Sequence, residues 1–383
     1  MMPWMRNPRK GHDLFSLFCY IGANNLTACC GEFTSGRSTS FSFLNMMKKS
    51  TCFIIAAFVF CTSGCALKKE VVCSGKTMGT TYHVKVVASV FRPTGSLQGQ
   101  IDRRLGEINR SMSTFLADSE ISRFNAMDAV GGAQAVSDDF FTVMQAAWRL
   151  YEVTGGAWDG TVMPLVDLWG FGSDEFSGMV PNPEVIERCL DAVGFSAIEL
   201  GPEQTLAKAR SEIRLDLASI AKGYGVDVLA ALLRDIGYGD FLVEVGGEVF
   251  AEGVRQDGKN WRVGINRPRT DAAFDDVYHV VPLAGKALAT SGDYRNYFEV
   301  EGRRYSHVID PRTGYPVANG VVSASVVAGT CTLADGLATA MMVMGADEAI
   351  ALANRMPDVS CLVVVQGVDG SLTDYRSDGF EFE

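Results

Sequence analysis

The stretch Leu215–Asp227 (LDLASIAKGYGVD) constrains the fold of this chain most, because it predicts a change of secondary structure within a few residues. An apolar run at Ile213–Leu217, interrupted by the single acid Asp216, is typical of a buried strand. Helical spacing follows and continues to Ile236, just before Gly237. A strand-to-helix junction presents backbone N–H groups and carbonyls together, which suits an anionic ligand and its metal. An aspartate that merely caps the helix is the alternative, and both interpretations stay open at this point.

Charge narrows the classes of partner. The chain has 383 residues and a formal net charge of −11. Residues 1–65 contain six Lys or Arg side chains and two acidic ones, so they carry +4 and the remainder carries −15. An acidic body lacks the basic face that nucleic acid requires, so we expect no nucleic-acid partner. The four cysteines after residue 65 have no CxxC spacing, so we expect neither a zinc site nor a disulfide framework.

The N-terminal region predicts a secretory signal. Met46–Lys49 is basic, Thr51–Cys61 is an apolar run too short to span a membrane, and small residues precede Cys65. This pattern is similar to a bacterial lipoprotein signal, with lipidation at Cys65, although Thr62 stands where leucine is usual. Ordinary signal cleavage nearby is the alternative. We expect residues 1–45 to be a mis-called extension, residues 46–64 the signal peptide and residues 65–383 the mature body.

The body mixes strands and helices without a regular repeat. Leu97–Met112 has amphipathic helical spacing, and Ser137 begins a second helix that runs through Val153. Residues 157–172 are rich in aromatics, Gly and Pro and predict an irregular loop. Because the elements do not alternate as βα units and no linker divides them, the predicted fold class is α+β in one domain. Further strands are predicted at Thr81–Ala88, Phe241–Val245, Val249–Ala251, Trp261–Ile265, Val277–Val281, Tyr297–Val300, Arg304–Ile309, Val321–Val327 and Val359–Val365.

Two polar segments near the C-terminus carry candidate chemistry. Asp335 and Thr339 lie four residues apart near the start of a helix for which Thr332 is the predicted cap, so their side chains share one face. A carboxylate and a hydroxyl are hard oxygen ligands of the kind that Mg²⁺ or Ca²⁺ prefers. An aspartate that only offsets the helix dipole is the alternative. His307 is followed by Asp310 in a polar turn, and a purely structural histidine is its alternative.

Seven ordered blocks of sequence together resemble the ApbE family of FAD:protein FMN transferases. The resemblance covers essentially the whole mature chain and implies a single ApbE-type, T-fold-like flavin transferase domain of mixed sheets with packed helices. The blocks, which run from Thr77 to Thr339, are TMGTTY, STFLADSEISRFN, GAWDGTV, DLASIAKGYGVD, TSGDYRNY, SHVIDPRTG and LADGLAT.

The resemblance implies an FAD site and a magnesium site. Phe115 stands where the family usually has tyrosine, so it keeps a stacking face but lacks the hydroxyl, and Trp158 stands where Phe or Leu is common. At the position of Ser219 the family varies among Ala, Ser and Thr, as expected if the backbone carbonyl of this residue is the metal ligand. The implied FAD contacts are Met78, Phe115, Ala157, Trp158, Asp159, Asp216, Lys222 and Ile309, and the implied Mg²⁺ ligands are Ser219, Asp335 and Thr339.

The implied activity is Mg²⁺-dependent transfer of FMN from FAD to a Thr or Ser hydroxyl of a target protein, with release of AMP. In this hypothesis His307, held by Asp310, accepts the hydroxyl proton. The alternatives are an FAD pyrophosphatase that uses water, and a flavin-binding lipoprotein without catalysis. Implied acceptors are subunits of Na⁺-translocating NADH:quinone reductase or Rnf-type complexes. We expect an extracytoplasmic, periplasmic-side protein anchored by lipid at Cys65; function favours the inner membrane, whereas Ala66 favours outer-membrane sorting.

Overall fold

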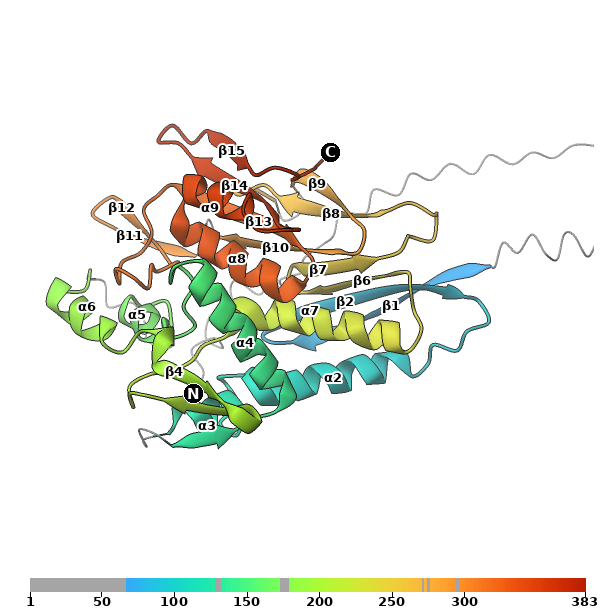
Figure 1. The fold of residues 1–383 in the computed structure, drawn as a ribbon. Coiled ribbons are helices and arrows are strands. Elements are labelled where there is room, and N and C mark those ends of the chain that lie inside the picture. Colours follow the sequence, from blue (N-terminus) through green and yellow to red (C-terminus); the bar gives the residue numbers. More distant parts are fainter. Residues whose placement is uncertain (1–66, 128–131, 173–178, 271, 274–275, 294–295) are drawn as a thin grey trace, which may run out of the picture.

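An antiparallel eight-stranded sheet forms the centre of the molecule (Figure 1). The computed structural model describes residues 67–127, 132–172, 179–270, 272–273, 276–293 and 296–383. The strand order is β1-β2-β6-β7-β10-β13-β14-β15. In this order the strands are Lys68–Thr77, Thr80–Ser89, Phe241–Val245, Glu248–Glu252, Lys286–Gly292, Val321–Ala328, Ser360–Gln366 and Leu372–Arg376.

Helices pack on one face of this sheet. Figure 1 shows α2, α4, α7 and α8 in a layer against it, with α5 and α6 together at one end. The helices are α2 (Leu97–Met112), α3 (Glu120–Asn125), α4 (Asp138–Val153), α5 (Met163–Leu168), α6 (Pro183–Leu190), α7 (Ala218–Asp235), α8 (Cys331–Met344) and α9 (Ala346–Ala353). Among the described residues, no helix is long and apolar enough to cross a membrane.

Three small sheets complete the fold of the described residues. The pair β8 (Trp261–Asn266) and β9 (Val277–Leu283) lies on the face opposite the helices, where it closes a second hydrophobic core. The pair β11 (Tyr297–Val300) and β12 (Arg303–Ser306) forms a hairpin. The strands β3 (Ala133–Ala135), β5 (Thr205–Lys208) and β4 (Ile198–Gly201) form the third sheet.

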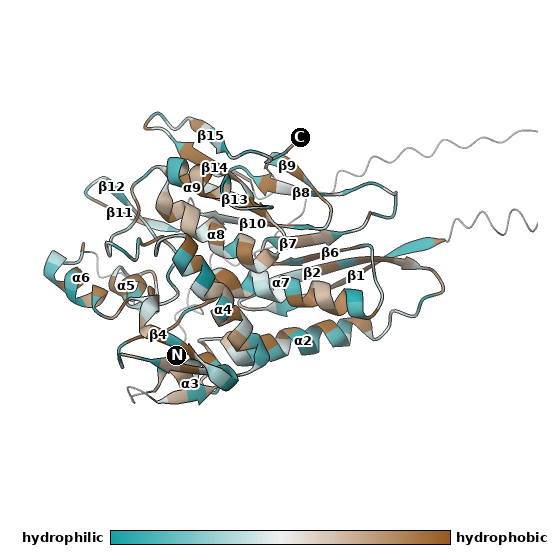
Figure 2. Cartoon of the chain, viewed as in Figure 1, coloured by the Kyte–Doolittle hydropathy of each residue, from teal (hydrophilic) through white to brown (hydrophobic). Residues whose placement is uncertain are grey.

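Alternation along the strands explains why both faces of the sheet are covered. On β6, Phe241 and Val243 belong to the core beneath the helices, whereas Leu242 between them belongs to the core beneath β8 and β9. Figure 2 shows α8 as hydrophobic or neutral over most of its surface, and eleven of its residues are buried. A helix buried on nearly all sides must pack closely against its neighbours, and this fixes the position of any polar group that it carries.

The α+β prediction is confirmed, and α2, α4 and β11 have the predicted bounds. The predicted strand at Ile213–Leu217 is wrong: these residues have no strand partner and α7 begins at Ala218. The Asn125 side chain takes the place of a neighbouring strand, because it donates to the Leu215 carbonyl at 2.9 Å and accepts from the Leu215 N–H at 2.7 Å. The segment is buried and apolar, but a side chain and not a sheet satisfies its backbone.

Other sequence predictions need smaller corrections. The loop predicted at residues 157–172 contains the short helix α5. Thr332 does not cap α8: Thr330 is the N-cap residue, and its hydroxyl accepts from the Leu333 N–H. The strand β1 is absent from the predicted strands, the first of which begins at Thr81. The signal peptide, Cys65 and Ala66 lie outside the described residues.

Candidate active site

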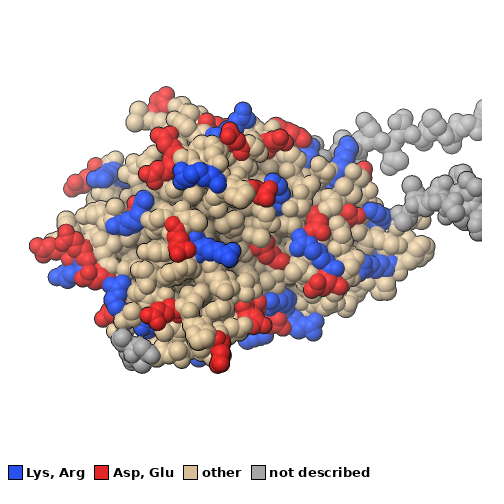
Figure 3. Space-filling model, in the orientation of Figure 1, with Lys and Arg blue, Asp and Glu red and all other residues tan. Residues whose placement is uncertain are grey.

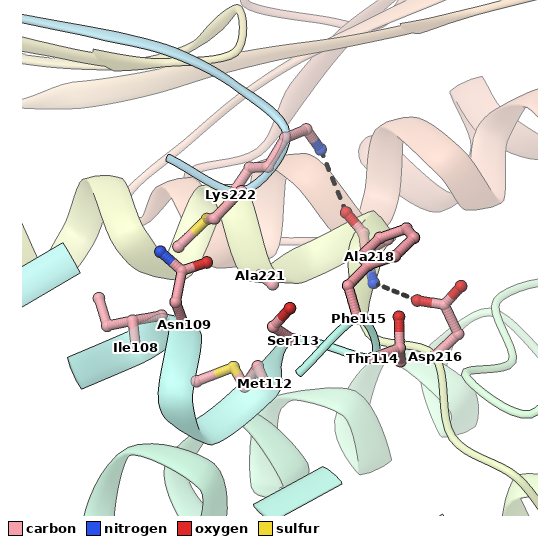
Figure 4. A pocket seen from close by; sticks show the side chains of 11 residues that line it. Ile108, Asn109, Met112, Ser113, Thr114, Phe115, Asp216, Ala218, Ala221 and Lys222 are labelled. Atoms are coloured by element: carbon pink, nitrogen blue, oxygen red, sulfur yellow. Dashed lines mark hydrogen bonds between the residues drawn. The ribbon is translucent and has the colours of Figure 1, made fainter. Parts of the chain in front are cut away.

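Two adjoining hollows of about 320 and 330 Å³ share Asp216 and Ala218 at the N-terminal end of α7. Figure 4 shows the first, which lies between the C-terminal end of α2 and the start of α7. It is lined by Met78, Ile108, Asn109, Met112, Ser113, Thr114, Phe115, Asp216, Ala218, Ala221 and Lys222. The second is lined by Ala157, Trp158, Asp159, Val162, Val166, Phe171, Asp216, Ala218, Ser219, His307, Val308, Ile309, Pro311, Thr339 and Val343.

The first hollow offers an aromatic rim and an apolar floor. Phe115 is 79% exposed, so its ring face is available to a planar ligand. Met78 occupies the turn between β1 and β2 with a φ of 48°, and the Asn109 amide steadies that turn by donating to Thr77 Oγ1 at 2.9 Å. The hollow is therefore formed by three separate parts of the chain: the β1–β2 turn, the end of α2 and the first turns of α7.

Asp216 faces both hollows and also serves the helix. Its Oδ1 accepts from the Ala218 N–H at 2.8 Å, as Figure 4 shows. Burial raises the pKa of Asp216, while the Ala218 N–H and the Lys222 charge act in the opposite direction. The aspartate therefore satisfies an N–H group at the start of α7, and its contact with a ligand stays a prediction.

The loop beside the second hollow is held by buried side chains. Trp158 is 1% exposed, and its indole N–H donates to Ser219 Oγ at 2.9 Å. Asp159 accepts from the N–H and hydroxyl of Thr161 and from the Phe195 N–H. The Ser219 side chain is thus occupied by Trp158, which is consistent with its carbonyl, and not its hydroxyl, as a metal ligand.

A buried charge cluster lies where α7, α8 and β7 meet. Lys222 Nζ lies 3.3 Å from Asp335 Oδ1, 3.4 Å from Glu248 Oε1 and 3.2 Å from the Ala218 carbonyl. Burial alone would lower the pKa of Lys222, but the charges of Asp335 and Glu248 outweigh it and raise that pKa above its ordinary value. The lysine therefore remains an ammonium that two buried carboxylates share.

Glycine makes this cluster possible. A Cβ on Gly223 would lie 2.3 Å from the Cys331 carbonyl oxygen and 2.9 Å from Asp335 Cβ. Without one, α7 approaches α8 so closely that the Gly223 N–H donates to Asp335 Oδ2 at 2.9 Å. One turn later, Asp227 accepts from the N–H groups of Cys331 and Thr332 and so satisfies two of the first N–H groups of α8, whose N-cap residue is Thr330.

His307 is held by a backbone carbonyl. Its Nδ1 lies 3.0 Å from the Asn296 carbonyl oxygen, which can only accept, so Nδ1 carries the proton and Nε2 carries the ring's basic lone pair. Burial lowers the pKa of His307, and this outweighs the opposing effects of the Asn296 carbonyl and of Asp293. The imidazole is therefore neutral at neutral pH and able to accept a proton.

Asp310 does not hold His307, and this prediction needs correction. Its carboxylate forms hydrogen bonds with the backbone N–H, Nε and Nη2 of Arg312, each at 2.9 Å. A bidentate pair with a guanidinium is geometrically specific, so it fixes the carboxylate within its own turn. Asp293, which the sequence reasoning assigned no role, is the acid whose charge acts on His307.

The candidate metal ligands suit a hard cation. Asp335 supplies a carboxylate, Thr339 a hydroxyl that lies 3.2 Å from Ser291 Oγ, and Ser219 a carbonyl. Among the described residues no group of three or more His, Cys, Asp or Glu side chains could bind a metal. One carboxylate with neutral oxygens is a typical magnesium set when substrate phosphates complete the shell, so the residues present fit Mg²⁺.

The hollows bring together most of the residues singled out from the sequence. All the expected FAD contacts line one hollow or the other, as do Ser219, Thr339 and His307. Asp335 lies behind this surface at 2% exposure, and Asp310 lies outside both linings. Sequence reasoning missed Glu248, although an acid directly after the glycine pair Gly246-Gly247 in an apolar strand run could have indicated it.

An aromatic rim, carboxylate and hydroxyl oxygens and a histidine with a lowered pKa surround the two adjoining hollows, a combination that is typical of an enzyme acting on a nucleotide. Residues 78–363 match the ApbE family. The chain is 42% identical over 334 residues to an FAD:protein FMN transferase of Vibrio cholerae, and the match covers 86% of this chain and 97% of that one. It is 39% identical over 338 residues to an FAD:protein FMN transferase of Haemophilus influenzae, again over 86% of this chain and 97% of that one.

Solved structures agree with this assignment. The flavin transferase ApbE from Vibrio cholerae superimposes with a TM-score of 0.74 at 41% identity, over 82% of this chain and 98% of that one. The flavinyl transferase ApbE of Pseudomonas stutzeri gives 0.73 at 36% identity, over 82% and 96%. The chain belongs to the ApbE family, and its enzyme class is transferase.

Proposed function

We propose that this enzyme transfers the FMN moiety of FAD to a Thr or Ser hydroxyl of an extracytoplasmic protein, in a Mg²⁺-dependent reaction that releases AMP. The observation that carries this proposal is the pair of hollows joined at Asp216 and Ala218. A dinucleotide has two ring systems separated by a pyrophosphate, and two hollows joined at a helix N-terminus match that shape and charge.

The chain's own residues divide the work. Phe115 and Met78 would contact one ring system in the first hollow, while Trp158 and Ile309 line the second hollow. Lys222 supplies positive charge at the first hollow, near the residues that the two share. Mg²⁺, held by Asp335, Thr339 and the Ser219 carbonyl, would supply further positive charge against the pyrophosphate oxygens.

The bond changes balance without an external oxidant or reductant. The acceptor hydroxyl oxygen forms a bond to the flavin-side phosphorus, and the bond from that phosphorus to the bridging oxygen breaks. AMP leaves with the bridging oxygen, and FMN stays on the acceptor as a phosphoester. His307 Nε2 accepts the hydroxyl proton, because it carries the ring's basic lone pair and the ring is neutral.

The test incubates the purified protein with FAD, Mg²⁺ and a Thr-containing acceptor protein. Transfer predicts flavin fluorescence that stays with the acceptor on a denaturing gel, an acceptor mass increased by one FMN residue, and one AMP per flavin attached. An acceptor with Val in place of the target Thr is the matched control. Free FMN with AMP and no labelled acceptor would instead identify a pyrophosphatase. FAD recovered intact would identify a flavin-binding protein.

Partners and location follow from the same proposal. We expect acceptors among subunits of Na⁺-translocating NADH:quinone reductase or Rnf-type complexes, and a lipid anchor at Cys65 on the periplasmic side. Figure 3 shows acidic and basic side chains interspersed on the face it presents. Labelling with a radioactive fatty acid, in native protein and in Cys65→Ser, tests the anchor. Fractionation of the two membranes decides between them.

A further inference from the structure

Glu248 is a buried acid that has no role in the proposed mechanism. It begins β7 directly after the turn at Gly246 and Gly247, and it is 4% exposed. Its Oε1 lies 3.4 Å from Lys222 Nζ, and its Oε2 is buried without a hydrogen-bond partner in the part of the chain that the structure describes. An acid oxygen left unpaired in the interior is destabilising, so this one needs a physical explanation.

The turn before Glu248 is shaped to admit Lys222. Gly246 has a φ of 63°, and a Cβ there would lie 2.8 Å from Thr80 Cγ2, 3.1 Å from Lys222 Cδ and 3.4 Å from Glu248 Oε2. The φ value and the lack of space both require glycine at this position. The stem of Lys222 therefore passes over the turn, and its ammonium comes to lie between two carboxylates.

The ammonium is shared loosely among its partners. Its contacts with the Ala218 carbonyl, Asp335 and Glu248 are 3.2–3.4 Å long, whereas charge-assisted hydrogen bonds are usually about 2.7–2.9 Å. One ammonium faces two buried acids, and burial raises the pKa of both, that of Glu248 to about 8, so the cluster holds one acid more than it has cations. That excess favours a second cation at Asp335, and Lys222 would then have Glu248 as its remaining carboxylate partner.

We infer that Glu248 is a positioning residue that keeps the Lys222 ammonium at the first hollow while Asp335 serves the cation. The inference rests on the proposed FAD site but not on transfer to an acceptor. Lys222 lines the hollow, whereas Glu248 does not, so Glu248 acts on a nucleotide only through the lysine. It thus adds to the FAD site a residue that neither hollow contains.

A double-mutant cycle on FAD binding tests this role. Glu248→Gln keeps the shape and removes the charge, Glu248→Asp keeps the charge, and Lys222→Met removes the group through which Glu248 acts. Equilibrium quenching of flavin fluorescence, without acceptor and with or without Mg²⁺, gives the dissociation constant of each variant. The matched control is Glu252→Gln at the other end of the same strand, where the glutamate pairs with Arg234 at the surface.

We expect Glu248→Gln to weaken FAD binding about tenfold, which is the effect of losing one charged contact, and Glu252→Gln to leave it unchanged. In the Lys222→Met background, Glu248→Gln should weaken binding no further. Glu248→Asp should recover most of the affinity, and Glu248→Met, which has an uncharged side chain of similar length, replaces Glu248→Gln in the cycle if the latter does not fold. Unchanged affinity in the single variant, or losses that add in the double variant, would overturn the inference. Because no acceptor is present, a failed transfer assay does not affect this result.

Discussion

Gly223→Ala tests whether the approach of α7 to α8 builds the active site. The new methyl group would lie 2.3 Å from the Cys331 carbonyl oxygen and 2.7 Å from the Cys331 carbonyl carbon. Both are backbone atoms, so no side-chain rotation relieves the contact and the two helices must separate. Separation also lengthens the 2.9 Å hydrogen bond from the Gly223 N–H to Asp335 Oδ2.

The expected change in the free energy of unfolding follows from two destabilising effects and one stabilising effect. Overpacking destabilises by about 1–3 kcal/mol. A weakened hydrogen bond to a charged acceptor adds about 1.5–3 kcal/mol. Replacing glycine by alanine inside a helix returns about 1 kcal/mol. We therefore expect the free energy of unfolding of Gly223→Ala to fall by about 1.5–5 kcal/mol, with weaker Mg²⁺-dependent turnover because Asp335 has moved.

Gly106→Ala is the matched control. Gly106 lies in the middle of α2, and the atom nearest to its added Cβ is a guanidinium nitrogen of Arg110 at 3.7 Å, an ordinary contact. Only the propensity gain applies there, so Gly106→Ala should stabilise by up to about 1 kcal/mol. Urea unfolding followed by circular dichroism measures both variants. A Gly223→Ala protein as stable as the parent would refute the close-approach argument.

Three further predictions concern the site itself. Asp335→Asn keeps an oxygen for the Gly223 N–H but loses the charge. Mg²⁺-dependent turnover should therefore vanish, while the melting temperature stays within a few degrees of the parent's. A Mg²⁺ titration of the transfer rate checks this. The pKa of His307 is lowered, so its neutral form persists to below pH 6.5 and the acid limb of the pH profile of kcat/KM should lie below that value. His307→Ala should lower the transfer rate about 10²–10⁴-fold. Full transfer by this variant would contradict the role of His307 as base. Ser219→Ala leaves the carbonyl in place but removes the acceptor of the Trp158 indole N–H, so transfer should be near normal and thermal stability lower by about 1 kcal/mol; a large loss of activity would contradict a carbonyl ligand.

The sequence predicts helices with a strong apolar stripe well and irregular backbone poorly. α2 and α4 have the predicted bounds because Leu97–Met112 repeats apolar residues at helical spacing and Ser137 caps the next helix. Ile213–Leu217 satisfies the composition of a strand, but composition cannot show that the Asn125 amide will replace a neighbouring strand. Hydrogen bonding between residues ninety positions apart leaves no local signal.

The same limit applies within the site. Family resemblance identified the residues that line the hollows, because those residues sit in recognisable motifs. It did not reveal that Asp310 would pair with Arg312, two residues away, and leave His307 to the Asn296 carbonyl. It also did not reveal Glu248, which approaches Lys222 only because α7 packs across the start of β7.

The segment Leu215–Asp227 positions helix α8. On α7, Lys222, Gly223 and Asp227 all contact α8: Lys222 faces the Asp335 carboxylate, Gly223 permits the close approach, and Asp227 accepts from N–H groups at the N-terminus. The spacing of residues 223 and 227 is one helical turn, so one stripe of α7 sets both the position and the register of α8. Because Asp335 and Thr339 follow on that helix, a shift in this stripe would displace both candidate ligands together. The register of the two helices would therefore decide whether the candidate metal ligands can come together.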